Sequence, residues 1–407
     1  KMLKNNISRR SFLKRTATGT TLASISPLSI SSMLNDHSDD KRILIVGAGP
    51  VGCVMAERCA TIKKWTSIII DRRNHIAGNC FDLRNKKNLL YHKYGPHYMR
   101  FKKKKIYKYV SKFTKWINGN YIVKSYIDGM LYPIPINLIT IEKFFNKKFK
   151  NEKDAKLFIS KKKIKIKNVK NSEDYILSKL GREIYENFYK NYTIKQWGRH
   201  PTELDKSICG RLPIRYNKNC FYVNEKMRFM PKEGYTKLFL NMINNSKISI
   251  KLNTSYKKIK SKIKPNIATI YTGPADEYFN YKFGRLEWRS LDFRFKTLKK
   301  KYIQDCVQIN YPNEKKYTRR VEIKHVTKQK SNYTSISYEY PKSGGDPYYP
   351  INNYKNIKKF NKYNKLMKME EKKRIFFEGR LAQYKYINMD EAIEKSLNLF
   401  EKVKNLK

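Results

Sequence analysis

The chain has 407 residues, enough for two or three domains, and its 40% hydrophobic and 14% aromatic content argues for a folded globular protein and against disorder. The formal charge of +55 would suit a nucleic-acid-binding protein, but no RNA- or DNA-binding motif accompanies it. Because the excess is Lys and comes with abundant Asn, Ile and Tyr, all with A/T-rich codons, we attribute the charge to genome composition and expect no nucleic acid partner.

Residues 1–40 are predicted to lie outside the fold. They contain Ser8-Arg9-Arg10-Ser11-Phe12-Leu13-Lys14, which matches the twin-arginine export signal, followed by a mildly apolar stretch over residues 16–34. A leader of this kind exports a folded, cofactor-loaded protein. The stretch contains Pro27 and lacks an Ala-x-Ala cleavage site, so a basic leader without an export role stays open as the alternative.

The first segment of the predicted fold combines an apolar run, a glycine-rich turn and a later acidic residue. Residues 43–46 and 67–70 have the pattern of buried parallel strands, and residues 53–59 that of the helix between them. Glycines in such a turn let the backbone approach a pyrophosphate at the helix N-terminus, and a carboxylate after the second strand accepts ribose hydroxyls. The segment therefore predicts a dinucleotide site that includes Gly47, Gly49, Val51, Gly52 and Asp71.

Strand and helix patterns continue along the rest of the chain. The predicted strands are residues 121–135 (two short strands around Asp128-Gly129), 248–252, 267–272, 302–310, 320–326, 333–340 and 374–380, and the predicted helices lie within residues 140–192 and at 390–403. Because the glycine-rich turn and the last strand and helix lie far apart, the dinucleotide domain is predicted to be discontinuous.

The cysteines and histidines indicate neither a metal site nor a disulfide framework. Six cysteines are scattered without a Cys-x-x-Cys pair, and the six histidines have no His-x-x-x-His spacing. No apolar run approaches the roughly 20 residues that span a bilayer, so no transmembrane segment is expected.

Motifs in a particular order point to one family. They are Tyr192-Thr193-Ile194-Lys195-Gln196-Trp197-Gly198, Arg211-Leu212-Pro213 with Tyr222, Gly379-Arg380-Leu381 with Tyr386, Tyr94-Gly95-Pro96-His97, Pro135-Ile136-Asn137-Leu138, Gly284-Arg285-Leu286 and Tyr317-Thr318-Arg319. Together they closely resemble the UDP-galactopyranose mutase family, collinearly from about Ile43 to the C-terminus. Their order carries the resemblance, because a single Tyr in a chain with 31 of them indicates little.

The resemblance implies an α/β fold with a discontinuous Rossmann-like FAD-binding domain, a helical domain and a twisted antiparallel β-sheet domain. The expected ranges are 41–105, 236–290 and 370–407 for the FAD-binding domain, 140–205 for the helical domain, and 106–139, 206–235 and 291–369 for the antiparallel sheet or substrate domain. Enzymes of the family are usually dimers, so a homodimer is expected.

The resemblance also implies a reaction. The family converts UDP-galactopyranose to UDP-galactofuranose, a precursor of cell-surface polysaccharide, without net redox change. FAD must be reduced, by NAD(P)H or another donor, so that its N5 can attack the anomeric carbon while UDP leaves. Such chemistry requires few protein acids or bases, but it requires a clamp of cations and phenols on the diphosphate.

Site residues follow by position in the matching motifs. The resemblance implies that Arg211 and Arg319 bind the diphosphate, and that the loop at residues 202–213 closes over the substrate. The remaining substrate-binding residues are Tyr192, which stacks on uracil, Thr193, Trp197 in the sugar pocket, and the phosphate-binding Tyr222, Tyr349 and Tyr386. The cofactor-binding residues are Gly47, Gly49, Val51, Gly52, Asp71, Arg72, Gly78, Asn79, His97, Arg380, Asn388 and Met389; His97 joins Arg211 and Arg319 as a catalytic residue.

Four positions depart from the family pattern. Ala77 replaces a Gly and adds a methyl group close to the flavin, and Arg100 replaces a His. Tyr121 stands where the family has an Asn that contacts the sugar, and Asn388 where it has an Asp. These changes leave the FAD site credible and bear on turnover.

A second function is an exported FAD-dependent oxidoreductase of the amine-oxidase type, which would share the dinucleotide domain and explain the leader. The two Arg and three Tyr of the expected clamp argue against it. UDP-sugars and nicotinamide reductants are cytoplasmic pools, so the mutase hypothesis predicts a cytoplasmic protein, whereas the twin-arginine motif predicts export to the periplasm.

Overall fold

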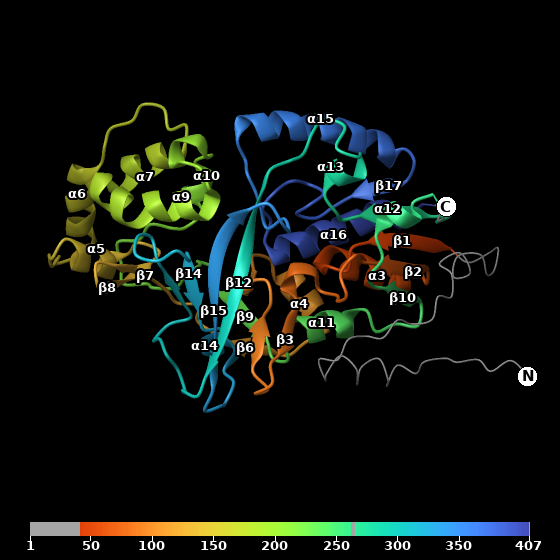
Figure 1. Cartoon of the computed structure of the whole chain (residues 1–407), viewed down its shortest axis with the longest axis horizontal. Helices are drawn as coiled ribbons and strands as arrows, with labels where there is room; N and C mark the ends of the chain where they lie inside the picture. The colour runs from red at the N-terminus through yellow and green to blue at the C-terminus, as the bar shows by residue number, and fades with distance from the viewer. Residues whose placement is uncertain (1–40, 262–264, 407) are drawn as a thin grey trace, which may run out of the picture.

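The structure is a computed structural model that describes residues 41–261 and 265–406. The expected leader, residues 1–40, lies outside the described residues. Figure 1 shows a parallel sheet around β1 (Arg42–Val46), a long central pair of strands, β12 (Trp288–Leu298) and β15 (Thr334–Ser343), and a group of helices beginning with α5 (Leu138–Phe144). This α/β arrangement confirms the predicted fold class.

The parallel sheet is built from three distant parts of the chain, as the sequence predicts. Its order is β10 (Ile248–Lys251), β2 (Thr66–Ile70), β1, β11 (Ala268–Tyr271) and β17 (Ile375–Phe377), with every neighbouring pair parallel. β1 lies at the centre and is buried along its whole length. Since the carboxyl ends of parallel strands share one edge, the turn after β1 and the residue after β2 meet there.

The two faces of the sheet are covered by different helices. Ile43, Ile45 and Ile69 belong to the core on the side of α3 (Pro50–Ile62), which packs against α16 (Met389–Val403). Leu44 and Ile70 face the opposite side, where residues of α15 (Tyr354–Glu371) join the cluster. Successive strand residues therefore enter different cores, which explains why these strands are continuous apolar runs.

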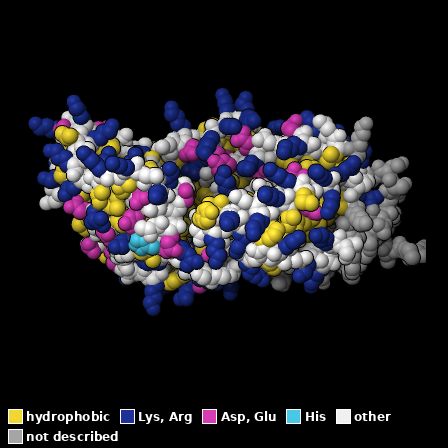
Figure 2. All heavy atoms as spheres, turned by 90° about the horizontal axis from the view of Figure 1, so that it is seen from above, with side chains coloured by type: hydrophobic (Ala, Val, Ile, Leu, Met, Phe, Trp, Pro, Cys, Tyr) yellow, Lys and Arg dark blue, Asp and Glu magenta, His cyan; other side chains and the backbone are white. Residues whose placement is uncertain are grey.

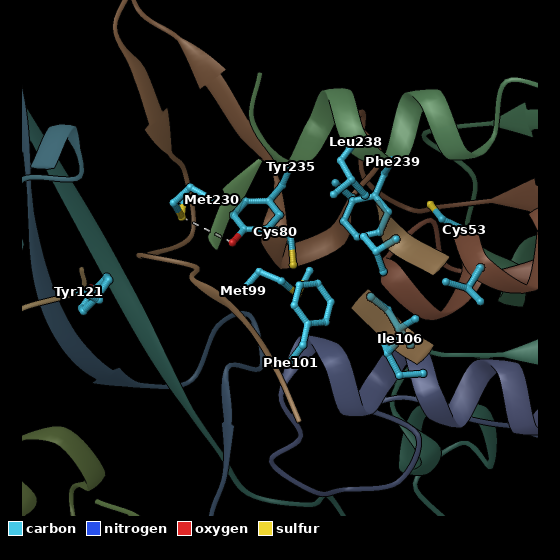
Figure 3. Close-up of a cluster of buried hydrophobic side chains, with 14 of the residues drawn as sticks. Cys53, Cys80, Met99, Phe101, Ile106, Tyr121, Met230, Tyr235, Leu238 and Phe239 are labelled. Carbon is cyan, nitrogen blue, oxygen red and sulfur yellow. Dashed lines mark hydrogen bonds between the residues drawn. The ribbon is translucent and has the colours of Figure 1, made fainter. Parts of the chain in front are cut away.

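Figure 3 shows part of the larger core, where side chains from several elements meet. Tyr235 and Phe239 come from α11 (Tyr235–Met242), Phe101 from β5 (Met99–Phe101) and Ile106 from α4 (Lys104–Val110). The Tyr235 hydroxyl is close to a sulfur acceptor, with 3.7 Å between its oxygen and Met230 Sδ. This core ties the parallel sheet to the strands on which the second half of the site is built.

The second sheet is mostly antiparallel, with the order β16 (Tyr349–Pro350), β12, β15, β14 (Arg319–Val321), β13 (Gln308–Asn310), β7 (Val123–Ile127) and β8 (Met130–Ile134). Only β13 and β7 pair in parallel among its neighbouring strands. The β12–β15 pair extends over ten residue pairs, Arg289↔Ser343 to Leu298↔Thr334, and forms its long axis (Figure 1).

Two predicted strands are shorter than expected. Of residues 302–310 only Gln308–Asn310 is a strand, and of residues 320–326 the strand ends at Val321, before the short helix α14 (Lys324–Thr327). The buried Glu322 carboxylate explains the difference, because it accepts hydrogen bonds from the backbone N–H groups of Ile303 and Gln304. Those groups bind a side chain in place of a neighbouring strand.

The remaining elements are shorter. The helical group continues with α6 (Glu152–Lys162), α7 (Ser172–Leu180), α8 (Arg182–Ile184), the π-helical η2 (Tyr185–Lys190), α9 (Asn191–Trp197), η3 (Pro201–Glu203) and α10 (Ser207–Gly210). Elsewhere lie η1 (Gly78–Cys80), β3 (Asp82–Arg84), β4 (Leu90–His92), β6 (Trp116–Asn118), β9 (Met227–Pro231), α12 (Tyr256–Ile259) and α13 (Ala275–Tyr278). Two small sheets, β3-β4 and β5-β9-β6, complete the strand pairing.

The surface carries basic side chains widely. On the face shown in Figure 2, Lys and Arg side chains are spread over the whole molecule, with acidic and apolar side chains among them. None of the helices in residues 41–261 and 265–406 is both long and apolar enough to cross a membrane. Across the same residues, no group of three or more His, Cys, Asp or Glu side chains is arranged to hold a metal ion.

Candidate functional site

The turn between β1 and α3 requires glycine at two positions. Gly47 has a φ of +110°, a conformation that L side chains rarely adopt. A Cβ atom on Gly52 would lie 1.9 Å from the carbonyl oxygen of Gly47, so only a hydrogen fits where the first turn of the helix passes beneath the loop. The backbone at the N-terminus of α3 is therefore open to an anionic group.

Asp71 holds this turn in place. Its Oδ2 accepts a hydrogen bond of 2.8 Å from the Ala48 N–H, and its Oδ1 accepts one of the same length from the Arg73 N–H. The carboxylate thus connects the ends of β1 and β2. Each oxygen keeps acceptor capacity toward the neighbouring cavity, as ribose recognition requires.

A cavity of about 680 Å³, the dinucleotide cavity, opens above this edge of the sheet. Its size lies in the range of about 300–1,000 Å³ that is usual for cofactor sites. Among the predicted cofactor residues it is lined by Gly47, Gly49, Val51, Asp71, Arg72, Gly78, Asn79, His97, Arg380, Asn388 and Met389. Gly379, with a φ of +103°, brings the backbone after β17 to the same cavity.

A second cavity, of about 400 Å³, is lined by strands β13 to β16 of the antiparallel sheet, by α9 and α10, and by residues that follow β17. We call it the Arg–Tyr cavity, because its lining includes Arg211, Arg319, Tyr222, Tyr349 and Tyr386, together with Trp197. Trp197 packs on Tyr349 with a ring-centroid distance of 5.6 Å, and Tyr349 stacks on Tyr386 at 6.0 Å.

The two cavities share one edge. Five residues line both of them: Asn79, His97, Arg380, Asn388 and Met389. A ligand in the dinucleotide cavity and a ligand in the Arg–Tyr cavity can therefore contact each other at this edge. These residues come from η1, from the segment before β5, and from the segment between β17 and the first residue of α16.

The two arginines of the Arg–Tyr cavity differ in how they are held. Arg319 Nε donates a 2.7 Å hydrogen bond to the Tyr192 hydroxyl oxygen, and its Nη1 lies 3.3 Å from Glu339 Oε2. Arg211 makes no hydrogen bond or ion pair with any described residue and is exposed. Arg319 is thus preoriented, whereas all donors of Arg211 are available to a ligand.

The charge around Tyr386 is strongly positive. Tyr386 is 39% exposed, and the Arg380 guanidinium lies 4.6 Å from its ring centroid. Burial would raise the pKa of the Tyr386 hydroxyl, but the four arginines near it, Arg380, Arg211, Arg100 and Arg319, hold that pKa below its ordinary range. For Tyr349, burial dominates and raises the pKa. Such a field favours a dianionic ligand.

His97 lies at the shared edge in neutral form. Its Nδ1 is 2.9 Å from the Gly95 carbonyl oxygen, which fixes that nitrogen as the N–H donor. Burial and the neighbouring Arg380 lower the pKa of His97 to about 4. Its Nε2 can therefore accept a hydrogen bond from a ligand, but it holds a proton poorly near neutral pH.

Three predicted site residues lie behind the cavity walls. Tyr192 contacts Arg319 and lines neither cavity, and Thr193 is buried, with its hydroxyl 3.6 Å from Cys209 Sγ. Gly52 lies beneath the turn. The predictions missed Glu339, whose only signal in the sequence is a single acidic residue within an otherwise uncharged predicted strand.

The four departures lie in different environments. Ala77 is fully buried and lines neither cavity, so its methyl group is not part of a ligand site; its φ of +68° is the notable feature. Arg100 lines the Arg–Tyr cavity, with Nε 3.7 Å from Glu225 Oε1. The Tyr121 hydroxyl donates a 2.8 Å hydrogen bond to Gln308 Oε1, and Asn388 Nδ2 donates one of 3.1 Å to a Glu391 oxygen.

Comparisons with known proteins agree with this geometry. Residues 187–386 match the family model of UDP-galactopyranose mutase, and residues 45–113 match that of an NAD(P)-binding Rossmann-like domain. The chain is 36% identical over 365 residues to a Klebsiella pneumoniae protein named probable UDP-galactopyranose mutase, which covers 88% of this chain and 94% of that protein.

Two further similarities extend the comparison. A dTDP-fucopyranose mutase of Escherichia coli is 32% identical over 369 residues, covering 88% of this chain and 96% of the relative. A crystal structure of reduced UDP-galactopyranose mutase superimposes with a TM-score of 0.73 at 13% identity, covering 89% of this chain and 93% of that one. The latter likeness supports the fold alone.

Proposed function

The chain belongs to the UDP-galactopyranose mutase family of isomerases, and from this we propose that it interconverts UDP-galactopyranose and UDP-galactofuranose with FAD as its flavin cofactor. One observation carries the proposal: the cavity lined by arginines and tyrosines shares an edge with the dinucleotide cavity. A nucleoside diphosphate held by Arg211 and Arg319 would have its sugar at that edge.

The residues of the dinucleotide cavity fit FAD. The N-terminus of α3 and the Gly47–Gly52 turn suit its pyrophosphate, and Asp71 suits a ribose. When bound and reduced, FAD supplies a nucleophilic nitrogen to the anomeric carbon, and we expect NAD(P)H or another donor to reduce it. Asn79, His97, Arg380, Asn388 and Met389 would surround its reactive end.

The Arg–Tyr cavity suits the diphosphate of the leaving UDP. Two planar guanidinium groups and three phenol donors match the oxygens of a dianionic group better than lysines would. Since Arg319 is already oriented by Tyr192 and Glu339, it needs little reorganisation to bind, whereas Arg211 can move onto the ligand. The clamp would stabilise negative charge that develops on UDP as the bond to the sugar breaks.

The proposal also covers setting and partners. We expect a homodimer that acts in the cytoplasm, where UDP-sugars and nicotinamide reductants occur, and whose product is used for galactofuranose-containing cell-surface polysaccharide. A related substrate pair is the second candidate, because a relative of comparable coverage is a dTDP-fucopyranose mutase. This substrate pair differs from the UDP-galactose pair in the nucleoside and in the hydroxyl at sugar carbon 6.

The test is turnover by the purified holoprotein. We expect dithionite-reduced protein to convert UDP-galactofuranose to UDP-galactopyranose. Anion-exchange chromatography would measure the conversion, and dTDP-fucofuranose would be assayed in parallel. Arg211→Ala should lower kcat/KM by about 100-fold or more, because the diphosphate loses a charged partner. Arg182→Ala is the control, since Arg182 is an exposed arginine of α8.

Three results would contradict the proposal in different ways. Reduced holoprotein that leaves both furanose substrates unchanged would exclude the mutase function. Preferred turnover of the dTDP sugar would mean that this sugar, and not UDP-galactofuranose, is the substrate. Turnover-linked reduction of FAD by an amine, without affinity for UDP, would favour the oxidoreductase alternative.

A further inference from the structure

Helix α15 has an exposed side that the proposed function does not use. Its other side is held in the fold: Tyr363 and Met367 are buried, and the Tyr363 hydroxyl donates a 2.8 Å hydrogen bond to the Gly284 carbonyl oxygen. The Asn353 side chain caps the helix N-terminus by accepting a 2.9 Å hydrogen bond from the Asn356 N–H. The helix is therefore preformed, and binding a partner through its exposed side would not require it to fold.

The exposed side combines apolar and basic side chains. Because an α-helix has 3.6 residues per turn, exposed residues at this spacing lie along one face of α15. We call it the outward face, and it consists of Tyr354, Ile357, Lys358, Asn361, Lys365, Lys368 and Met369. Figure 1 shows α15 along the upper edge of the molecule, and Figure 2 looks down on that side, where apolar side chains lie among basic ones.

The apolar residues of the outward face are unusually exposed. Among the large hydrophobic side chains of the described residues, Tyr354 and Met369 are the two most exposed, at 80% and 60%, and Ile357 is 45% exposed. A single exposed apolar side chain is ordinary in a folded protein. Three of them on one face of one helix indicate a surface that a partner covers.

The lysines of the outward face have no acidic partner. Lys358, Lys365 and Lys368 form no ion pair or side-chain hydrogen bond with any described residue. The acidic residues of α15, Glu370 and Glu371, both lie in its last turn and outside the outward face. Since lysines occur over the whole surface, the distinguishing feature of α15 is that unpaired lysines and exposed apolar side chains share one face.

We propose that the outward face docks the protein on the surface of an anionic lipid bilayer, which is a function beyond the proposed isomerisation. The lysines would lie at the level of the lipid phosphates, while Tyr354, Ile357 and Met369 enter the boundary between headgroups and acyl chains. The 18 residues of α15 extend over about 27 Å, so the helix lies flat on the surface and does not cross the bilayer. The attachment is reversible and weakens with salt.

Two other partners fit this face less well. In a twofold interface between copies of the chain the outward face would meet itself, so Lys358, Lys365 and Lys368 would approach like charges. A nucleic acid would attract the lysines but would leave Ile357 and Met369 without an apolar environment. An anionic bilayer accommodates both kinds of side chain.

Vesicle binding by the full chain tests the proposal. The probes are vesicles of phosphatidylcholine alone and vesicles that also contain about 30% phosphatidylglycerol, at about 0.15 M salt. We expect wild type to sediment with the anionic vesicles only. The α15 lysine variant, which combines Lys358→Gln, Lys365→Gln and Lys368→Gln, should lower the partition coefficient by at least about tenfold.

Helix α6 provides the matched control. The α6 lysine variant combines Lys153→Gln, Lys156→Gln and Lys161→Gln, and it loses the same charge as the α15 lysine variant. These three lysines are also exposed and form no ion pair with a described residue. Their loss should change the partition coefficient by less than about twofold, because they lie outside the proposed docking face.

The apolar residues are tested separately. The apolar variant combines Tyr354→Ser, Ile357→Ser and Met369→Ser and should also bind anionic vesicles at least about tenfold more weakly. Leu157→Ser is its control, since Leu157 is a 58% exposed apolar residue of α6. Insertion can be observed directly: brominated acyl chains should quench the fluorescence that Tyr354→Trp adds, but not the fluorescence that Leu157→Trp adds.

Four results would overturn the inference. Wild type could fail to bind anionic vesicles, or the apolar variant could bind them as wild type does. Equal losses for the α15 and α6 lysine variants would show that vesicle affinity follows the charge of the whole surface. If the α15 lysine variant lost affinity for duplex DNA and kept its vesicle binding, the face would bind nucleic acid instead.

These outcomes are independent of the proposed function. No residue of the outward face lines the dinucleotide cavity or the Arg–Tyr cavity, so every α15 variant should keep wild-type turnover. Wild-type protein that fails to convert either furanose substrate would count against the mutase function and would not change the expected vesicle binding.

Discussion

Arg319 Nε, in the wall of the Arg–Tyr cavity, donates a 2.7 Å hydrogen bond to the hydroxyl oxygen of Tyr192, which lies behind that wall. Tyr192 was expected to stack on the nucleotide base. In the structure its hydroxyl orients the guanidinium of Arg319, and burial raises the pKa of the Tyr192 hydroxyl to about 12, opposed by Arg319, so the hydroxyl remains a neutral acceptor. The contact predicts a role for the hydroxyl that stacking would not require.

Replacing Tyr192 by Phe should separate these roles. The ring stays, so stacking would persist, but Arg319 loses an acceptor. A hydrogen bond to a charged group contributes about 1.5–3 kcal/mol, so we expect the Kd for UDP to rise by about tenfold. Isothermal titration of the holoprotein would measure it, with the exposed Tyr354→Phe as the control. An unchanged Kd for Tyr192→Phe would show that the hydroxyl contributes nothing to binding.

The glycine turn gives a second prediction, through a matched pair of substitutions. In Gly52→Ala the new methyl would lie 1.9 Å from the Gly47 carbonyl oxygen, so the turn must open and both stability and flavin content should fall. Gly49 has an ordinary φ of −79°, and the nearest atom to its Cβ position, Gly78 Cα, is 3.9 Å away. Gly49→Ala should therefore fold normally.

Gly49→Ala should bind FAD at least about tenfold more weakly, because its methyl group would line the dinucleotide cavity where we propose that the pyrophosphate approaches the backbone. Thermal unfolding of the apoproteins and the flavin absorbance of the purified proteins would distinguish the variants. If Gly49→Ala retained full flavin content, the pyrophosphate would not lie against this residue.

The parallel sheet could be predicted because its central strands, β1 and β11, are buried along their whole length and mostly apolar. Strand β12 could not be predicted, because residues such as Asp292 and Lys296 are exposed and its extended conformation depends on the long pairing with β15. α15 was also missed. Only Asn356, Tyr363 and Met367 of its 18 residues are buried, so its apolar face is too narrow to give a helical pattern.

The sequence could predict which residues belong to the site, but not whether each one lines the cavity or lies behind its wall. The order of the motifs was enough to name Arg211, Arg319 and the three tyrosines around them. Whether a residue such as Tyr192 forms the wall or supports it depends on packing between distant segments. Glu339 has no motif of its own, and only its burial in the cavity wall and its contact with Arg319 make it visible.

Ala77 offers a prediction about stability. Its φ of +68° is left-handed, which costs a residue with a Cβ about 1–2 kcal/mol. Ala77→Gly removes that cost but also a buried methyl group worth about 0.8 kcal/mol, so we expect net stabilisation of up to about 1 kcal/mol. The unfolding midpoint should rise by roughly 2 °C in calorimetry. Ala56→Gly, in the middle of α3, should instead lower the unfolding midpoint, because glycine is less favourable than alanine inside a helix. A fall for both variants would refute the strain at Ala77.

Two buried histidines, His75 and His92, and the partly buried His97 predict how stability depends on pH. Burial, the largest cause for each, lowers the pKa of His92 to about 3 and those of His75 and His97 to about 4, against an ordinary 6.5. In the unfolded chain they bind protons as the pH falls below about 6.5, while in the folded chain they do not. Their contribution is therefore fully present above about pH 6.5 and is lost as the pH falls toward 4.

His92→Asn isolates one of these protons. Its Nδ1 accepts a 2.9 Å hydrogen bond from the His97 N–H, and an Asn oxygen can replace that acceptor. Each such proton changes the unfolding free energy by about 1.4 kcal/mol per pH unit, so between about pH 6 and 4 the variant should lose stability less steeply than wild type by about that amount. Urea unfolding at several pH values measures the slope. Between about pH 7 and 8 both proteins should differ by a constant, because neither the folded nor the unfolded state gains a proton at this position there. Parallel curves down to about pH 4 would mean that His92 becomes protonated within the folded protein.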